Sequence, residues 1–387
     1  MDSLWPDGDS DSDKDAGAAE GVLEEEPLDD GASDDADDDG EGANEEAVAP
    51  AGAFASREVV VQRIEAVAEE LATALLAHPP TVPALVLHAP GGTVKKHLLR
   101  PKDSASVVRL WRVLAEIHGN LTASRTATQR ELYYSLVDGQ TVKSAVHVNA
   151  AIQQAARLLG VPRQCLGVTC ASRGIVTGCL SIREDSGLWV DLSGGSERAI
   201  PGDMDRIAAA VLRSDARRIL VVEKDAVFNR LLQEGICAQL HAVMLTAKGQ
   251  PDLATRAFLR KLADLLPGTP VLGVFDYNPS GVLILSTYRR GAKGRQVMEA
   301  GRHDVDVKWL SARRADVAPL PDAALQPLTP RDLVLLRNMQ ADRRFDAYAQ
   351  ELAAMQTRGL KAELESLYKE GDLSAVLAPK ILRCDFV

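Results

Sequence analysis

The sequence predicts two folded domains, an α+β domain followed by an α/β domain with a mostly parallel sheet. Between residue 56 and about residue 195, amphipathic helices come first and β-rich segments follow. From about residue 200, apolar strands alternate with helices, which is typical of a parallel sheet. The chain has 387 residues, 46% hydrophobic and 26% charged, so it can form the buried cores that two such domains need.

The first part of the chain differs from the rest in its charge. Residues 1–50 hold twenty acidic residues and the single lysine Lys14, a local charge of −19, and almost no large apolar side chains. Such a segment cannot bury enough surface to offset the entropy lost on ordering, so we expect residues 1–55 to be a disordered acidic tail. Because the whole chain carries −11, residues 51–387 carry +8. A basic body favours a polyanionic partner, although enzymes with no nucleic-acid role also reach this charge.

The predicted first domain, residues 56–195, contains helices followed by β-rich runs. The expected elements are a helix in 56–78 capped by Ser56, a strand in 83–89, helices in 105–121, 122–138 and 142–160, the first of them closed by Gly119, and two β-rich runs in 165–182. Helix, helix and β-hairpin is the order of a winged helix-turn-helix, whose second helix enters a DNA groove while the hairpin contacts the backbone. A small α+β domain with no DNA role has the same order and remains the alternative.

The predicted second domain, residues 196–387, alternates strands and helices. The expected order is a strand and helix in 217–235, a strand in 241–249, a helix in 252–268, a strand, turn and helix in 270–291, and a strand in 305–311. The pattern in 332–368 predicts helices that pack back on the body. We therefore expect a mostly parallel sheet whose ligands bind at the carboxyl ends of the strands.

Two adjacent tyrosines stand in the stretch "TQRELYYSLVDG", residues 128–139. On a helix, Arg130 and Tyr134 share one face, while Tyr133 points about 100° away with the neighbouring apolar side chains. One phenol is then part of the core and the other is free to react. A phenol with a pKa near 10 is a poor nucleophile, so a reacting tyrosine needs a nearby cation and a strong electrophile.

Acidic residues follow two of the predicted strands. Glu223 ends the apolar run "ILVV" and Asp276 ends "VLGVF", so both carboxylates should emerge at one edge of the sheet. Hard oxygen ligands that converge in this way suit Mg²⁺. For one acidic residue after a strand, a helix cap or a solvated role is the commoner interpretation, but the pair favours a metal site.

These segments carry a family resemblance. "TQRELYY" is similar to the active-tyrosine motif, Arg-acid-aliphatic-aromatic-Tyr, of the type VI DNA topoisomerase A-subunit family, whose eukaryotic members make meiotic DNA double-strand breaks. "VVEKDAVF", "TAKGQPDLATR" and "FDYNPSGVLILSTYRRG" resemble the Toprim blocks of that family in the same order. The resemblance extends over roughly residues 58–385.

The resemblance implies a role for each candidate residue. It makes Tyr134 the nucleophile that attacks a DNA phosphate and stays on the 5′ end, with Arg130 stabilising the developing charge. It assigns the second domain to the Toprim fold and places Mg²⁺ on Glu223, Asp276 and Asn278. It also implies double-stranded DNA as substrate, a homodimer for cutting both strands, and a partner of the topoisomerase VI B-like subunit type that binds the first helix. The location that it implies is on meiotic chromosomes in the nucleus.

Four basic residues are candidates for contacts with the DNA backbone. Arg163 and Arg173 belong to the predicted winged-helix domain, and Lys248 and Arg256 belong to Toprim-like blocks. Exposed arginines on turns are common, so the sequence leaves a purely structural role open for each of them. No pattern indicates base-specific readout.

One residue departs from the family pattern and keeps two alternatives open. The family commonly has Asp-x-Asp where this chain has Asp276, Tyr277 and Asn278, which removes one negative charge from the metal site. The first alternative is therefore a DNA-binding homologue with an impaired metal site and a structural role in the break-forming complex. The second is a Toprim nuclease or primase-like enzyme, which would not need Tyr134 or its flanking helices.

Cysteine usage and hydropathy indicate the kind of compartment in which the protein is expected to work. The five cysteines form no C-x-x-C pair, and their odd number argues against full pairing, so we expect a reducing compartment. No run approaches the roughly 18 apolar residues of a membrane-spanning helix, and the acidic start is unlike a signal peptide.

The charge distribution yields a first prediction. DNA affinity of residues 51–387 should fall linearly on a log-log plot against salt, because Lys and Arg contacts to phosphate release condensed counterions. Deleting residues 1–50 from the full chain should tighten binding, because the tail competes with DNA for the basic body. Fluorescence anisotropy across a salt series checks both points, and a salt-independent affinity would contradict the prediction.

Overall fold

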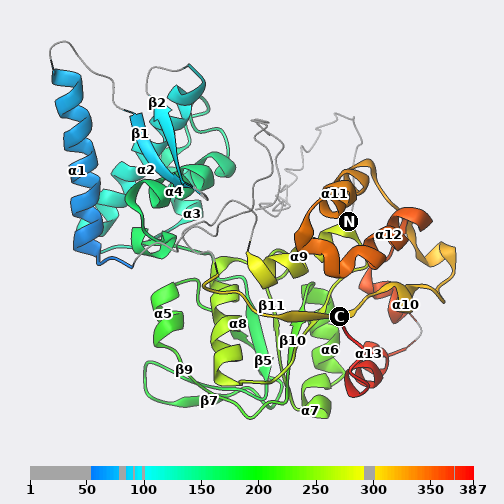
Figure 1. The fold of residues 1–387 in the computed structure, drawn as a ribbon. Coiled ribbons are helices and arrows are strands. Elements are labelled where there is room, and N and C mark those ends of the chain that lie inside the picture. Colours follow the sequence, from blue (N-terminus) through cyan, green and yellow to red (C-terminus); the bar gives the residue numbers. More distant parts are fainter. Residues whose placement is uncertain (1–53, 78–83, 90–91, 98–100, 292–300, 370) are drawn as a thin grey trace, which may run out of the picture. The chain divides into compact units, whose positions relative to one another are not determined.

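The computed structural model describes residues 54–77, 84–89, 92–97, 101–291, 301–369 and 371–387 (Figure 1). The expected disordered tail, residues 1–55, lies outside these residues except for its last two. Within the described part, buried apolar side chains form two separate hydrophobic cores. The first draws on residues between Val60 and Val168, and the second on residues between Val176 and Ile381.

Helices dominate the first core. Its elements are α1 (Arg57–Leu76), β1 (Ala84–Ala89), β2 (Gly92–His97), α2 (Pro101–Thr122), β3 (Ala127–Thr128), α3 (Gln129–Leu136), α4 (Ala145–Leu159), the 3₁₀ helix η1 (Arg163–Leu166) and β4 (Val168–Thr169). Ser56 caps α1 as predicted, because its hydroxyl accepts from the amide of Val59. Helix α4 buries one face, including Ile152 and Ala155, against its neighbours and ends at Gly160 in the left-handed conformation.

Two helix boundaries and one strand in this region differ from the sequence prediction. Helix α2 continues through Gly119 to Thr122, since an isolated glycine lowers helix stability without ending a well-packed helix. The helix expected in residues 122–138, with Ser124 or Thr126 as its cap, is α3 and begins at Gln129. Thr128 and Glu131 form a capping box that fixes its N-terminus there. The strand β2, antiparallel to β1, was not predicted.

The predicted β-hairpin in residues 165–182 is wrong. Its first run forms β4, which pairs in parallel with β3, and its second forms β5 (Ile175–Gly178), which joins the large sheet of the second core. Gly178 shows why β5 belongs there. A Cβ atom at this position would lie 2.3 Å from the Ala242 carbonyl oxygen, so only glycine allows the two backbones to approach. The division between the cores therefore falls near residue 170, not near residue 195.

The second core surrounds a six-stranded sheet. Its strands are β5, β8 (Arg198–Ala199), β10 (Arg218–Val222), β11 (Ala242–Thr246), β12 (Val271–Val274) and β13 (Val307–Ser311), in the order β13-β12-β10-β11-β5-β8. The four strands from β13 to β11 are parallel, while β5 and β8 are antiparallel to their neighbours. A separate antiparallel sheet consists of β7 (Trp189–Asp191), β6 (Ser181–Arg183) and β9 (Val211–Arg213). The prediction of a mostly parallel sheet is confirmed.

Helices cover the sheet (Figure 1). They are α5 (Met204–Ala209), α6 (Asp225–Gln233), α7 (Ile236–Leu240), α8 (Leu253–Leu265) and α9 (Pro279–Arg290). The chain leaves β10 through α6 towards β11, but returns through α8 to β12 on the other side of β10. Since such crossovers are right-handed, α6 and α8 lie on opposite faces. The carboxyl ends of β10 and β12 therefore form a topological switch point, the usual ligand site of such sheets.

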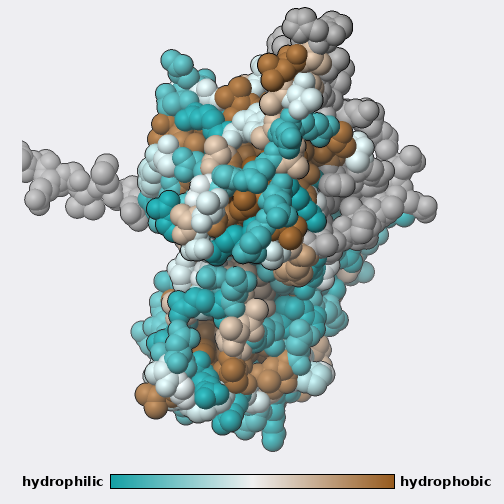
Figure 2. Space-filling view, turned by 90° about the vertical axis from the view of Figure 1, so that its left-hand side faces the viewer, coloured by the Kyte–Doolittle hydropathy of each residue, from teal (hydrophilic) through white to brown (hydrophobic). Residues whose placement is uncertain are grey.

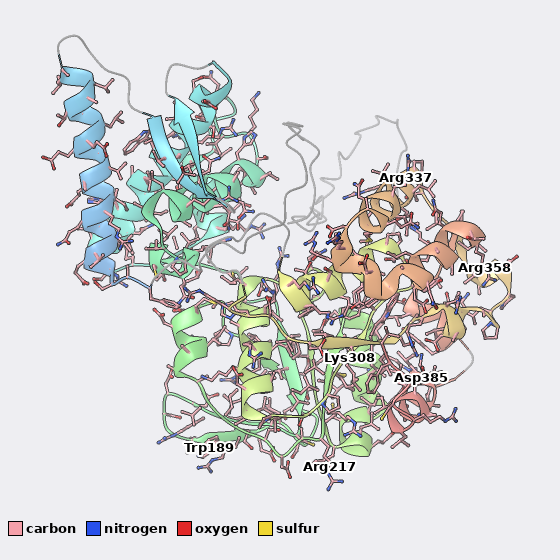
Figure 3. All side chains as sticks on the ribbon, in the orientation of Figure 1. Trp189, Arg217, Lys308, Arg337, Arg358 and Asp385 are labelled. Carbon is pink, nitrogen blue, oxygen red and sulfur yellow. The ribbon has the colours of Figure 1, made fainter. Side chains whose placement is uncertain are left out.

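The C-terminal part packs against this sheet. It contains α10 (Arg314–Val317), η3 (Asp322–Ala324), β14 (Gln326–Pro327), α11 (Pro330–Gln340), η4 (Arg343–Tyr348), α12 (Ala349–Arg358), β15 (Leu360–Lys361), η5 (Leu364–Leu367) and α13 (Leu373–Leu382). Helices α11 and α12 carry Arg337 and Arg358, labelled in Figure 3. Tyr277 and Ala362 exchange two main-chain hydrogen bonds, of 2.9 and 3.0 Å. These bonds hold the segment after β15 at the end of β12.

One face of the molecule is mostly polar. Figure 2 shows one face on which hydrophilic side chains dominate and hydrophobic ones are scattered. Among the described residues, no helix has both the length and the apolar character needed to cross a membrane.

The loop after α3 depends on Asp138. Its Oδ1 accepts hydrogen bonds from the amides of Val142, Gln140 and Thr141 at 2.8–2.9 Å, and its Oδ2 pairs with Arg112 at 2.5 Å. These main-chain hydrogen bonds, of which the one from Val142 has the largest effect, outweigh burial. They hold the pKa of Asp138 well below its usual range.

This pKa yields a second prediction. Asp138→Asn should lower the melting temperature at neutral pH, because the ionised carboxylate is the form that the folded loop stabilises. Since the folded pKa lies below the unfolded value of about 4, the stabilisation is present above pH 4 and is lost as the pH falls further. Melting curves from pH 7 to pH 2 should show parent and variant converging. Asp185→Asn, at an exposed position, is the control, and a constant difference at all pH values would contradict the assignment.

Candidate active site

The two tyrosines of α3 lie in different surroundings. The Thr128 hydroxyl accepts from the amide of Glu131, and the Glu131 carboxylate accepts from the amide of Thr128, which holds the first turn. Tyr133 packs against the first core, whereas 60% of Tyr134 is exposed. Nε of Arg130 donates to the Tyr134 hydroxyl at 3.3 Å, and the guanidinium lies 5.8 Å from the ring centre. The expected shared face of Arg130 and Tyr134 is therefore present.

Arg163 connects α3 to α4 from inside the domain. Its guanidinium donates to Oε1 of Gln129 at 2.9 Å and to Oδ1 of Asn149 at 3.3 Å, and the residue is buried. Gln129 is the first residue of the tyrosine helix. This position indicates that Arg163 holds the tyrosine helix in place. It does not favour the DNA contact that the sequence suggested for Arg163.

The other three candidates for contacts with the DNA backbone differ in how far they are buried. Arg256 is 2% exposed and pairs with Asp304 at 3.4 Å, which favours a structural role. Lys248 is exposed, follows β11 with a φ of 58°, and pairs with Asp225 at 3.3 Å. Arg173 is half-buried in the segment before β5. Lys248 therefore has the most accessible charge of the four.

The carboxylates of Glu223 and Asp276 meet at the ends of β10 and β12. Oε2 of Glu223 accepts from the amide of Asp276 at 2.8 Å, and the two residues are 7% and 2% exposed. Burial raises the pKa of both groups, and the Asp276 carboxylate raises that of Glu223 further, while Lys224 opposes the rise at Asp276. The structure thus brings together two carboxylates that lie 53 residues apart in the sequence.

Asn278 lies beside this pair but is partly committed elsewhere. Its Oδ1 accepts from the amide of Gly281 at 2.7 Å and caps α9, and its Nδ2 lies 3.5 Å from Oδ2 of Asp276. An oxygen that caps a helix is a weaker candidate for a metal ligand than the sequence spacing suggested.

Three further residues belong to the site and were missed by sequence reasoning. Nζ of Lys224 contacts the carboxylates of Asp276 at 3.0 Å, Glu365 at 2.9 Å, and Glu363. The amide of Leu364 also donates to Oδ1 of Asp276 at 2.8 Å. Lys224 directly follows Glu223, so the motif "EK" was a local signal, but nothing near residue 363 indicated its distant partner.

The donor set fits a divalent cation. Carboxylate oxygens of Asp276, Glu363 and Glu365 all lie within 4.8 Å of one another. Glu223 is not part of this group, and its Oε2 accepts from the main-chain amide of Asp276. Carboxylates at this spacing are the ligands that Mg²⁺ prefers.

A second constellation, at the end of the sheet near β5, is less suited to chemistry. The Cys179 thiol lies 3.6 Å from Nδ1 of His241, whose Nε2 lies 3.0 Å from Asp215, and all three line a cavity of about 540 Å³. Burial, then the charges of Asp215 and Asp191, raise the pKa of Cys179. A protonated thiol is a weaker nucleophile than a thiolate, which disfavours a catalytic role for this group.

Comparisons with known proteins identify the class. Residues 105–168 match the family described as type IIB DNA topoisomerase, and residues 218–378 match the Toprim domain of the topoisomerase 6 A-subunit/Spo11 family. The meiotic recombination protein SPO11-2 of Oryza sativa subsp. japonica is 37% identical over 300 residues, covering 76% of this chain and 78% of the relative. The DNA topoisomerase 6 A-subunit of Arabidopsis thaliana is 34% identical over 287 residues, 71% and 66% of the two chains. The meiotic recombination protein SPO11 of Homo sapiens is 31% identical over 295 residues, 73% and 72%.

The fold and the site thus define a protein of the type IIB DNA topoisomerase class, with a Toprim domain. The chain belongs to the topoisomerase 6 A-subunit/Spo11 family. The resemblance read from the motifs is confirmed.

The acidic edge yields a third prediction. Glu223→Gln and Asp276→Asn should each weaken Mg²⁺ binding about tenfold or more, because each removes a negative charge beside the ion. Asn278→Asp should tighten binding, since an aspartate retains the helix cap and adds a charge. Isothermal titration with Mg²⁺ measures all three.

Asp332→Asn is the matched control, because Asp332 is a buried carboxylate paired with Lys361 and not with the cluster. Unchanged Mg²⁺ affinity in Glu223→Gln and Asp276→Asn would show that the ion binds elsewhere.

Proposed function

We propose that this protein is a topoisomerase-like DNA transesterase that makes meiotic DNA double-strand breaks through a covalent link to Tyr134. The observation that carries the proposal is the exposed Tyr134 hydroxyl held 3.3 Å from Nε of Arg130 on a capped helix. A nucleophile that attacks a bulky polyanion must project from the surface. It also needs a cation that is placed before the reaction begins.

The proposed step exchanges one phosphodiester for another. The Tyr134 oxygen bonds to phosphorus, the bond from phosphorus to the 3′ oxygen breaks, and the protein stays on the 5′ phosphate. The phenol loses its proton to solvent, and the 3′ oxygen gains one. Arg130 stabilises negative charge on the phenolate and on the pentacoordinate phosphorus. Because the bonds made and broken have similar free energies, the step needs no ATP and is near-reversible.

The acidic edge supplies the second half of the proposed site. Glu223 and Asp276, with Glu363 and Glu365 beside them, would hold Mg²⁺, which supplies Lewis-acid stabilisation of phosphate charge when bound. Asn278, buried beside Asp276, contributes a neutral amide. Lys248 supplies an accessible positive charge for the DNA backbone near the same strand ends.

The proposed substrate and partners follow from the chemistry and the family. We infer that α3 and α4 belong to a winged-helix-type DNA-binding domain, supported by the family match over residues 105–168 and not by the hairpin expected in residues 165–182. One tyrosine cuts one strand, so a double-strand break needs two copies related by a two-fold axis. The proposed partner is a topoisomerase VI B-like subunit, docked on α1, and the proposed location is on meiotic chromosomes in the nucleus. The names of the relatives support both.

A catalytically impaired DNA-binding homologue is the second candidate. Asn278 supports it, because the amide adds no charge and its oxygen caps α9. An assay for covalent protein–DNA adducts separates the two candidates, since only the transesterase forms such an adduct. A Toprim nuclease is less well supported, because it gives no role to the paired Arg130 and Tyr134.

The fourth prediction concerns the nucleophile. Tyr134→Phe should abolish covalent attachment to DNA, because it removes the attacking oxygen, and should leave the fold and DNA binding unchanged. Adducts are trapped by denaturation after incubation with DNA, Mg²⁺ and a B-type partner, and are counted on a gel.

Tyr133→Phe is the matched control, since it removes a hydroxyl from the neighbouring ring, whose centre lies 5.4 Å away, and should retain most of the adduct. Loss of adduct in Tyr133→Phe together with its retention in Tyr134→Phe would reverse the assignment. Adduct in neither variant, with DNA binding preserved, would show that the pair acts as a unit.

A further inference from the structure

Lys224 occupies an unusual place in the acidic edge. It is the N-cap residue of α6, where the partial positive charge of the helix N-terminus disfavours a cation. Its side chain is 26% exposed, and burial also opposes its charge. Against both effects, its ammonium lies 3.0 Å from Asp276 and 2.9 Å from Glu365 and also contacts Glu363. The lysine is therefore held at this position by the carboxylates around it.

The oxygens that hold Lys224 are the ones that a metal ion would use. Oδ2 of Asp276, Oε2 of Glu365 and the Glu363 carboxylate all contact its ammonium, and oxygens of these three residues converge within 4.8 Å. Two cations cannot share these oxygens at full strength, because each repels the other at such short range. The ammonium and a divalent ion must compete.

Lys224 also joins segments that are far apart in the sequence. Asp276 follows β12, and Glu363 and Glu365 lie in the segment that contains η5. Without a cation between them, the buried Asp276 carboxylate and the partly exposed Glu363 and Glu365 carboxylates would repel one another. The position of the C-terminal segment therefore depends on a positive charge here.

We propose that Lys224 is a positioning residue that serves as the internal counter-cation of the metal site, holding Glu363 and Glu365 against Asp276 and lowering the affinity for the divalent ion. The inference rests on the proposed metal site. Its consequence is a site that keeps its shape without metal and binds the ion weakly and exchangeably.

A purely structural ion pair would behave differently. Removing an ordinary ion pair lowers stability whether or not a divalent ion is present, and leaves metal affinity unchanged. Removing an internal counter-cation lowers stability only when metal is absent, and tightens the binding of the metal that replaces it.

The test uses Mn²⁺ as the probe and the full chain. For Lys224→Met, the dissociation constant for Mn²⁺, measured by electron paramagnetic resonance of the free ion, should fall about tenfold, because one like charge is removed from the site. Its melting temperature in EDTA should drop below that of the parent, and saturating Mn²⁺ should restore it. Lys224→Arg keeps the charge and should match the parent in affinity.

Lys380→Met is the matched control. Lys380 is a buried lysine that pairs with both oxygens of Asp316 at 2.6 Å, outside the cluster. Its loss should lower the melting temperature in a way that Mn²⁺ does not restore. If Lys224→Met fails to fold in EDTA, Lys224→Gln, which keeps a hydrogen-bond donor, is measured in its place and should show the same tighter binding.

The outcomes separate this inference from the function on which it rests. Absence of saturable Mn²⁺ binding in the parent would overturn the metal site and the inference together. Binding in the parent that Lys224→Met and Lys224→Gln leave unchanged or weaken would overturn the inference alone. If Mn²⁺ also restored the melting temperature of Lys380→Met, the stabilisation by the ion would be unspecific, and the inference would be overturned.

Discussion

Asp276 joins three parts of the second core that are distant in sequence, through its carboxylate and its main-chain amide. Its Oδ1 accepts from the amide of Leu364, its Oδ2 lies 3.0 Å from Nζ of Lys224, and its own amide donates to Glu223. The residue is 2% exposed, so an uncompensated charge here would cost several kcal/mol. Asp276 therefore fixes how the ends of β10 and β12 and the C-terminal segment lie against one another. The proposed metal site depends on the same residue.

The alternation of strands and helices and the acidic edge were predictable because their signals are local. A buried parallel strand appears as a short apolar run, and the residue after it lies at the carboxyl edge wherever the strand stands in the sheet. Glu223 and Asp276 could be paired for this reason. The tyrosine helix was predictable in the same way, because the spacing of Arg130 and Tyr134 places them on one face of any helix.

The remainder depends on contacts that leave no local pattern. The strand β5 has the composition of a hairpin strand, and only its pairing with β11, more than sixty residues later, decides its sheet. Lys224 and Glu363 are 139 residues apart, and each resembles an ordinary surface charge in the sequence. Arg163 likewise resembles an exposed turn arginine until its hydrogen bonds to Gln129 and Asn149 are known.

The two halves of the proposed site meet opposite electrostatic demands. In the proposed reaction, Tyr134 must reach a DNA phosphate. Its exposure and its place beside Arg130, whose charge would attract the substrate, fit that demand. The acidic edge carries the sign that repels DNA, and its carboxylates cannot approach a phosphate unless cations lie between them. Lys224 supplies one positive charge permanently, and a bound divalent ion would supply two more. In the proposed reaction, the ammonium would limit the repulsion of DNA in the metal-free protein, and a bound divalent ion would allow the phosphate to approach closely enough to react.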